Sequence, residues 1–241
     1  KWGATWTPAE INDPNFGVAI AAQRTGGNPD ASIDDMSIIV YYSILPPSAP
    51  SAPTASGITG NYVNAATVSF TTRANLGTSG AIAGNTIELL LGGSPFSTPK
   101  TAVLTGTDIT NGYKDFTVTP ADLGADGSKS ITSRATNSAG TGLPSPALVL
   151  TKDTVSPTVV SAKITGPNTI TMVYSESVIS VIGDYSGLVL SPGGPRSVTA
   201  STTGSATILL TFDGAAAATS ATATIDISSP VDGAGNVVAA V

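Results

Sequence analysis

The densest group of oxygen donors in the sequence is the run Asp232-Gly-Ala-Gly-Asn236, near the C-terminal end of the chain. Carboxylate, amide and carbonyl oxygens suit a hard cation such as calcium, so Asp232 and Asn236 are the candidate metal ligands. A glycine-rich turn, in which both side chains hydrogen-bond their own backbone, explains the same residues. We favour the turn, because calcium takes about 6–8 oxygens and only two side chains are in sight. No cofactor is therefore expected, with calcium as the alternative.

Trp2 and Trp6 are the second candidate group, because they are the only tryptophans of the chain. Residues four apart lie on the same face of an extended strand. An exposed pair would form a platform on which a sugar ring stacks, which makes these residues the candidate carbohydrate-binding site. The alternative, which we favour, is that both rings are buried in the core of a β-sandwich, where aromatic side chains contribute large apolar area.

Most catalytic machinery is excluded by residue type. The chain has no histidine and no cysteine, so serine–histidine and cysteine–histidine nucleophile systems cannot form, and neither can disulfides or thiolate metal sites. A hydrolase with paired carboxylates remains formally open. However, the sequence shows no tight acidic cluster with aromatic neighbours. We therefore predict no catalytic residues and no enzyme activity.

Composition and charge indicate an exported all-β protein. The net charge of −6 and pI near 4.4 argue against nucleic acid or an anionic membrane surface as a partner. Charged residues make up only 11%, so Thr, Ser, Asn and Gly must cover the solvent faces, as is typical of exported surface proteins. The 26 Gly and 17 Pro predict many short strands joined by tight turns. The most apolar stretch, residues 37–45, is too short to span a membrane.

Four segments are predicted along the chain. Residues 1–43 are expected to supply about three strands, and residues 44–53 (ILPPSAPSAP) a semi-rigid Pro-rich linker. Residues 54–153 and 154–241 are each expected to form a β-sandwich. The boundary between these two units lies in KDTVSPT, where Pro157 lacks an amide donor and restricts the residue before it, so strand pairing stops there.

Alternation of apolar residues gives specific strands. We expect a strand at residues 66–72 with Ala66, Val68 and Phe70 on one face, a strand at residues 101–110, and a type I′ hairpin turn at Asn111-Gly112. The predicted core consists of eight side chains, namely Phe70, Leu89, Ile131, Ile170, Met172, Ile208, Leu210 and Phe212.

Several motifs resemble known families. The D-T-x-x-P junction, the strand T-I-T-M-V-Y-S-E-S-V and the turn D-x-A-G-N at Asp232–Asn236 resemble tandem bacterial Ig-like domains of the Big or S-layer-adhesin type. The pattern W-G-x-x-W-T-P-A-x-I-N within residues 1–43 resembles the C-terminal strands of a jelly-roll module in large bacterial surface or phage virion proteins. In the unit 54–153, Asn137 stands where the Ig-like family often has Asp.

These resemblances imply an all-β chain of tandem Ig-like sandwiches preceded by part of a jelly roll. The implied function is that of a non-enzymatic structural or adhesive segment, located extracellularly on a bacterial cell surface or a virion. Its expected partners are neighbouring subunits or an upstream part of the same protein, with surface glycans also open. A carbohydrate-binding accessory region of a secreted enzyme is the alternative.

Overall fold

The computed structural model describes Glu10, Asp13 and residues 44–191, 193–214, 222–228 and 230–239. The chain divides into two compact units, Lys1–Ser43 and Ile44–Val241. The predicted jelly-roll strands, Trp2 and Trp6 lie outside the described residues. Among the residues that are described, no helix has the length and apolar character needed to cross a membrane.

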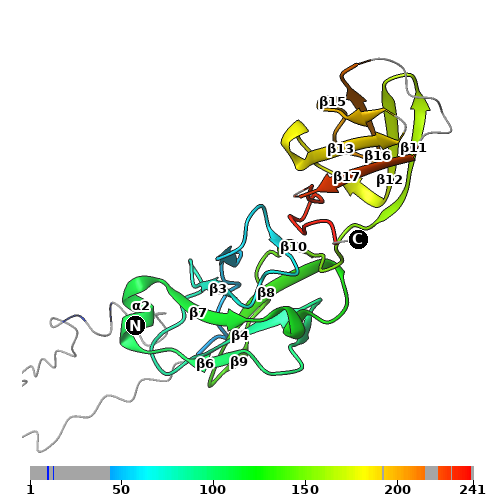
Figure 1. Cartoon of the computed structure of the whole chain (residues 1–241). Coiled ribbons are helices and arrows are strands. Elements are labelled where there is room, and N and C mark those ends of the chain that lie inside the picture. Colours follow the sequence, from blue (N-terminus) through cyan, green and yellow to red (C-terminus); the bar gives the residue numbers. More distant parts are fainter. Residues whose placement is uncertain are drawn as a thin grey trace, which may run out of the picture. The chain divides into compact units, whose positions relative to one another are not determined.

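The predicted all-β fold class is confirmed, and strands between residues 54 and 152 form a first sandwich (Figure 1). One of its sheets has the order β1-β3-β7, and the other has the order β2-β10-β8-β4-β5, with β6 beside β4 and β9 beside β8. The bounds of the strands are β1 Thr54–Ser56, β2 Tyr62–Val63, β3 Phe70–Asn75, β4 Thr86–Leu91, β5 Ser94–Pro95, β6 Thr101–Val103, β7 Tyr113–Val118, β8 Gly127–Asn137, β9 Gly140–Thr141 and β10 Leu148–Lys152.

The core of this sandwich forms where the inner faces of the two sheets meet. Phe70, Leu89 and Ile131 are each no more than 3% exposed, which confirms the prediction for them. The predicted strand start at Ala66 is wrong, because β3 begins only at Phe70, and Val68, expected on the same strand face as Phe70, is 84% exposed. The cause is Asn64, whose side-chain oxygen accepts hydrogen bonds from the Ala66 amide and the Thr67 hydroxyl and so holds this stretch in a turn.

The strand predicted at residues 101–110 ends at Val103, and helix α2 (Gly106–Asn111) follows. A reciprocal capping box starts the helix, because the Thr105 hydroxyl accepts from the Asp108 amide while the Asp108 carboxylate accepts from the Thr105 amide. Gly112 closes the helix in the left-handed region, with φ of 78°. The predicted hairpin at Asn111-Gly112 is therefore wrong, and this dipeptide is a helix C-cap.

Strands between residues 159 and 227 form a second sandwich (Figure 1). One sheet has the order β11-β12-β16-β15 and the other the order β14-β13-β17. A short 3-10 helix, η2, precedes β13, as η1 (Pro120–Leu123) follows β7 in the first sandwich. The bounds are β11 Val159–Gly166, β12 Thr169–Val178, η2 Ile182–Asp184, β13 Tyr185–Ser191, β14 Gly194–Pro195, β15 Val198–Ser201, β16 Ser205–Phe212 and β17 Thr222–Ile227.

The second core follows the alternation of its strands closely. The β12 and β16 residues predicted to be buried are at most 2% exposed, which confirms the strand phase, namely Ile170, Met172, Ile208, Leu210 and Phe212. Tyr174 and Tyr185 are also buried, with their hydroxyl oxygens 3.3 Å apart. Each sandwich therefore has a separate apolar core.

The Pro-rich segment 44–53 lies against the first sandwich. The Ser48 amide donates to the Ser79 carbonyl at 2.8 Å, and the Ser51 amide donates to the Asn75 carbonyl at 3.1 Å. The side-chain nitrogen of Asn137 donates to the Leu45 carbonyl at 2.8 Å. The prolines at positions 47, 50 and 53 are buried. This segment thus belongs to the packing of the sandwich and is not a free spacer.

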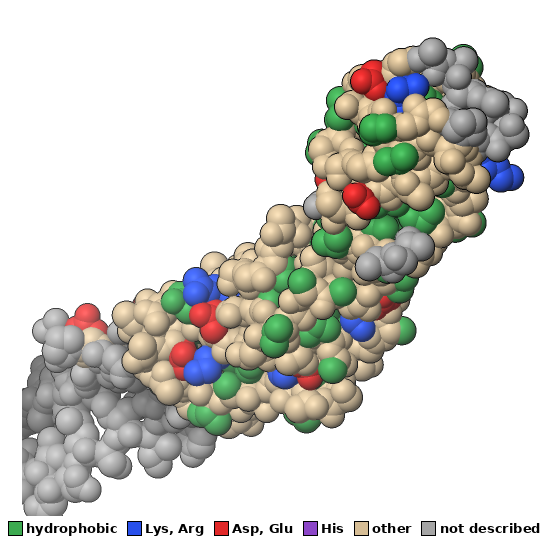
Figure 2. All heavy atoms as spheres, in the orientation of Figure 1, with side chains coloured by type: hydrophobic (Ala, Val, Ile, Leu, Met, Phe, Trp, Pro, Cys, Tyr) green, Lys and Arg blue, Asp and Glu red, His purple; other side chains and the backbone are tan. Residues whose placement is uncertain are grey.

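Uncharged polar groups dominate the visible surface, and the few charged side chains occur mainly as pairs of opposite sign (Figure 2). Arg73 forms a two-point contact with Asp115 and lies 3.4 Å from the ring centroid of Tyr113. Lys100 and Asp122 form a more buried pair at 2.9 Å. An exposed pair such as Arg73–Asp115 contributes little to the free energy of unfolding, about 0–1 kcal/mol.

Candidate functional site at the joint between the sandwiches

The joint consists of residues 153–158, between the end of β10 and the start of β11. None of these residues belongs to a strand, yet their backbone is held from both sides. The Asp153 amide donates to the Val63 carbonyl at 2.9 Å, and the Thr154 amide donates to the Asp126 carboxylate at 2.7 Å. On the side of the second sandwich, the Pro157 carbonyl accepts from the Ala239 amide at 2.9 Å. The joint is therefore anchored at both of its ends.

The predicted turn Asp232–Asn236 lies beside this joint and is well ordered by its own hydrogen bonds. One carboxylate oxygen of Asp232 accepts from the amides of Ala234 and Asn236, at 2.8 and 2.9 Å. The other accepts from the side-chain nitrogen of Asn236 at 2.8 Å. Asp232 and Asn236 are only 2% and 3% exposed. The structure therefore contains the side-chain-to-backbone turn that the sequence favours.

The turn also binds the first sandwich. The side-chain nitrogen of Asn236 donates to the Asp153 carbonyl at 2.9 Å, and its side-chain oxygen accepts from the Ala65 amide at 2.7 Å. In the opposite direction, the side-chain nitrogen of Asn64 donates to the Ala234 carbonyl at 3.0 Å. Three hydrogen bonds thus connect one turn of the second sandwich to two segments before β11.

Gly235 is required at this contact. Its φ is +85°, and a Cβ at this position would lie 3.3 Å from the side-chain nitrogen of Asn64. A side chain would therefore be strained by the backbone conformation and would also crowd the bond from Asn64 to Ala234. Gly235 of the D-x-A-G-N motif thus allows a close approach between the sandwiches.

Three carboxylates converge at the same place. Asp153, Glu176 and Asp232 each present one oxygen, and these oxygens all lie within 4.8 Å of one another. Asp153 comes from the joint, Glu176 from β12 and Asp232 from the turn. None of the ion pairs among the described residues includes any of the three. Burial, together with repulsion from Asp232 and Asp153, raises the pKa of the Glu176 carboxyl group.

Carboxylate oxygens are ligands that a hard cation such as calcium takes, and none of the three forms an ion pair with a Lys or Arg in the described part of the chain. The triad shares only Asp232 with the pair predicted from sequence. The side chain of Asn236 bridges the turn to the Ala65 amide and the Asp153 carbonyl. Sequence reasoning missed Asp153 and Glu176. Asp153 belongs to the D-T-x-x-P motif, but no local signal links Glu176 to either motif.

No family model matches the chain, and no curated protein matches it. Solved structures with similarity include a 1.5-MDa bacterial ice-binding adhesin described for host cell surface retention, with 17% identity over 79% of this chain and 65% of that chain, at a TM-score of 0.31. A Ca2+-stabilized adhesin of an Antarctic bacterium has 18% identity over 80% of this chain and 50% of that chain, at 0.32. The FN1–FN3 domains of chicken CNTN1 have 12% identity over 81% of this chain and 65% of that chain, at a TM-score of 0.26.

This chain therefore spans less than two-thirds of the length of each of those three structures. Identities and scores this low transfer no function from those proteins to this one.

Proposed function

We propose that this chain is a non-enzymatic structural segment of an exported surface protein, of the adhesive class, in which two β-sandwiches are held in one orientation. The observation that carries the proposal is the set of hydrogen bonds from the turn Asp232–Asn236 to Asp153, Ala65 and Asn64. A flexible tether would not require a buried asparagine at its joint whose side-chain nitrogen and oxygen both form hydrogen bonds. Fixed joints are what a segment needs in order to place a distant binding domain.

The absence of histidine and cysteine from the whole sequence agrees with a structural role. So does the scarcity of charge, because the surface is covered by short uncharged polar side chains that suit an extracellular location. No described observation favours the carbohydrate-binding alternative, whose residues Trp2 and Trp6 lie outside the described part of the chain.

The proposal extends to calcium at the triad Asp153, Glu176 and Asp232. A divalent cation there would offset the repulsion among three carboxylates that come from the joint, from β12 and from the turn. Binding would therefore stabilise the arrangement in which the joint and the second sandwich are together. Asn236 would hold the Asp153 backbone in place while the carboxylates bind the ion.

The experiment that tests the structural role is 15N relaxation of the chain in solution. A fixed joint predicts a single rotational correlation time for the amides of both sandwiches. Independent sandwiches would show two distinct and shorter times, and that result would contradict the proposal.

Calcium is tested separately by thermal unfolding with added calcium and then with EDTA. A ligand that binds only the folded state, at a free concentration 100 times its Kd, raises the free energy of unfolding by about 2.7 kcal/mol. We expect calcium to raise the midpoint of the second sandwich, and Glu176→Gln to weaken this response. Glu88→Gln is the matched control, because Glu88 pairs with Arg134 within the first sandwich. An unchanged midpoint in calcium would remove the cation from the proposal and leave the hydrogen-bonded joint in place.

A further inference from the structure

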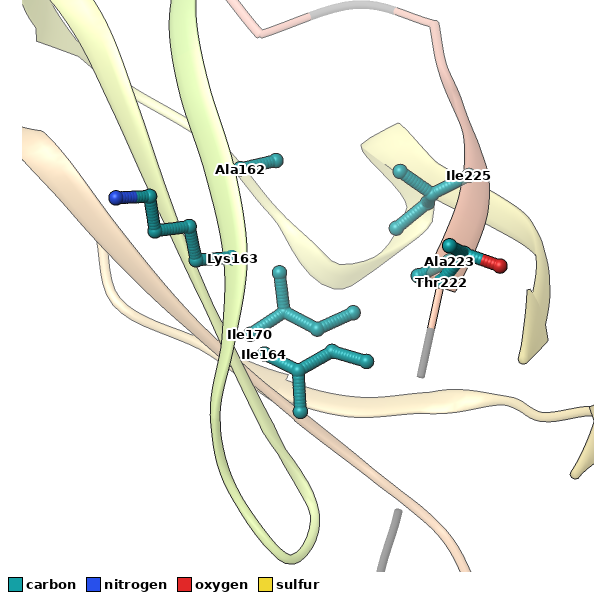
Figure 3. A pocket seen from close by; sticks show the side chains of 7 residues that line it. All are labelled: Ala162, Lys163, Ile164, Ile170, Thr222, Ala223 and Ile225. Carbon is teal, nitrogen blue, oxygen red and sulfur yellow. The ribbon is translucent and has the colours of Figure 1, made fainter. Parts of the chain in front are cut away.

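A groove with an apolar floor opens along one edge of the second sandwich, between β11 and β17. Its volume is about 410 Å³, and it is lined by Ala162, Lys163, Ile164, Ile170, Thr222, Ala223 and Ile225. Figure 3 shows the isoleucine side chains extending into this space from β11, β12 and β17, while the amine of Lys163 points away from it. The groove therefore lies between the two sheets.

Among the described residues, neither strand that borders the groove has a partner on this side. Among the described residues β11 pairs only with β12, and β17 pairs only with β13. Ala162 is opposite the fully buried Met172, so it lies on the inner face, yet it is exposed. Ile164 and Ile225 are only half-buried. Inner-face residues are thus left partly uncovered where the two sheets should close.

The first sandwich shows what closes the equivalent edge. Its strand β10 lies between β2, to which it is parallel, and β8, to which it is antiparallel. The parallel contact is made by the Thr151 amide donating to the Asn61 carbonyl and by the Asp153 amide donating to the Val63 carbonyl, both at 2.9 Å. Here the inner residues Val63, Ile131 and Leu150 are at most 1% exposed.

The second sandwich contains the beginning of the same contact. The Ala239 amide donates to the Pro157 carbonyl at 2.9 Å, just before β11 starts, and Val238 packs partly against the core. β11 runs away from Pro157 toward the groove, and β17 runs in the opposite direction. A strand that continues the path of Val238 and Ala239 would therefore be parallel to β11 and antiparallel to β17, as β10 is to β2 and β8.

We propose that the groove between β11 and β17 is the acceptor for one further β-strand, joined covalently to the chain after Ala239. Its backbone would pair with the free edge of β17, and every second side chain would enter the groove. The inward side chains of this strand should be small or β-branched and apolar, because they would contact Ala162, Ile164 and Ile225. With a rise of about 3.3 Å per residue, roughly seven residues reach from the level of Pro157 to that of Ile164.

A covalently attached strand is favoured over a strand from another molecule. The Ala239–Pro157 bond already holds the chain at the entrance of the groove, so an attached segment competes at a high effective concentration, in the millimolar range for a short connection. The function proposed for the joint can fail without affecting this strand site, because the site rests on the uncovered edges of β11 and β17 and not on the bonds of Asn236.

The test adds an eight-residue extension of alternating Thr and Val to Val241 of the full chain, with a Gly-Ser extension of equal length as the control. The readouts are amide hydrogen exchange at Thr222–Ile227, the unfolding midpoint, and the mass in solution. The Thr-Val chain is expected to remain monomeric, to slow exchange of β17 amides that do not bond β13 by about tenfold or more, and to unfold at a higher temperature. Ala162→Arg, at an exposed position, should abolish this gain without unfolding the chain.

Three results would overturn the proposal. Equal exchange in the Thr-Val and Gly-Ser chains would mean that the groove accepts no strand. Protection of the same β17 amides in the unextended monomer would mean that other residues of the chain already cover the edge. Protection that appears only in dimers of the unextended chain would identify a second copy as the donor.

Discussion

The side-chain nitrogen of Asn236 lies 2.9 Å from the carbonyl oxygen of Asp153, a residue 83 positions earlier in the sequence. The same side chain accepts a hydrogen bond from Ala65 at 2.7 Å, so a single asparagine bonds the joint and the first sandwich at once. Asn236 is 3% exposed, and loss of its side chain would remove a hydrogen bond from the buried Asp232 carboxylate. The Ala65 amide and the Asp153 carbonyl would lose their bonds to Asn236 as well. An unsatisfied buried donor or acceptor costs about 1–3 kcal/mol.

Asn236→Ala should therefore destabilise the contact between the sandwiches by about 1–3 kcal/mol while leaving both cores folded. Hydrogen exchange of the Ala65 amide measures this directly, because this amide donates to the Asn236 side chain, and it should become faster. Asn85→Ala is the control, because Asn85 caps only the local amide of Ile82 in the first sandwich. Unchanged exchange at Ala65 in Asn236→Ala would show that the bond does not close the joint.

The pH dependence of the second sandwich follows from Glu176, whose pKa is raised in the folded state by burial and by two neighbouring carboxylates. The folded state then holds the proton more tightly than the unfolded state does. The free energy of unfolding must therefore fall as the pH rises from the unfolded value, about 4.3, through the raised folded value. Without calcium, the second sandwich should be more stable in mild acid than at neutral pH.

Glu176→Gln should flatten this dependence, as measured by urea unfolding across the acidic range. Asp115 in the first sandwich provides a contrast, since the hydrogen bond from Arg73 lowers its pKa. The stabilisation that comes from this lowered pKa is present above the pKa of Asp in the unfolded chain, about 3.9, and is lost as the pH falls below that value. A Glu176→Gln variant that keeps the wild-type pH profile would contradict the assignment.

Phe70 tests the inner face of the first sandwich. It is 3% exposed, and Phe70→Ala should cost about 3–5 kcal/mol because it removes buried apolar contacts and leaves a cavity. Val68→Ala is the matched control, since Val68 lies two residues earlier and is 84% exposed. Denaturant unfolding should show a change of less than about 0.5 kcal/mol for this control. Comparable losses in the two variants would mean that β3 begins earlier than described.

Thr105 tests the helix that replaces the predicted strand. Thr105→Ala removes the hydroxyl that caps the Asp108 amide and should cost about 0.5–2 kcal/mol. Thr107→Ala, on an exposed residue of the first turn of α2, should be close to neutral by the same unfolding measurement. If the two substitutions cost the same, the capping box does not stabilise the helix.

The strand phase of both cores could be predicted from sequence because alternation with period two places one face inward, as at Ile208, Leu210 and Phe212. Errors arose where a side chain bonds the local backbone. Asn64 turns the residues expected to begin β3, and the Thr105–Asp108 pair starts a helix inside an apolar run.

Only part of the candidate site could be predicted from the sequence. Asp232 and Asn236 lie in one short motif, so their association is local and visible. Glu176 reaches them through the pairing of β12 within its sheet, and Asp153 reaches them through the path of the joint. Contacts of that kind depend on tertiary structure, which residue spacing does not encode.

We propose that the turn Asp232–Asn236 fixes the two sandwiches relative to each other. Because the chain has no cysteine, spin labels can be placed at Thr101→Cys and Thr207→Cys, both exposed, one in each sandwich. Double electron–electron resonance then measures the distribution of distances between them. A single narrow distribution that broadens in Asn236→Ala is the predicted result. A broad distribution in the chain with Asn236 intact, with and without calcium, would contradict the claim.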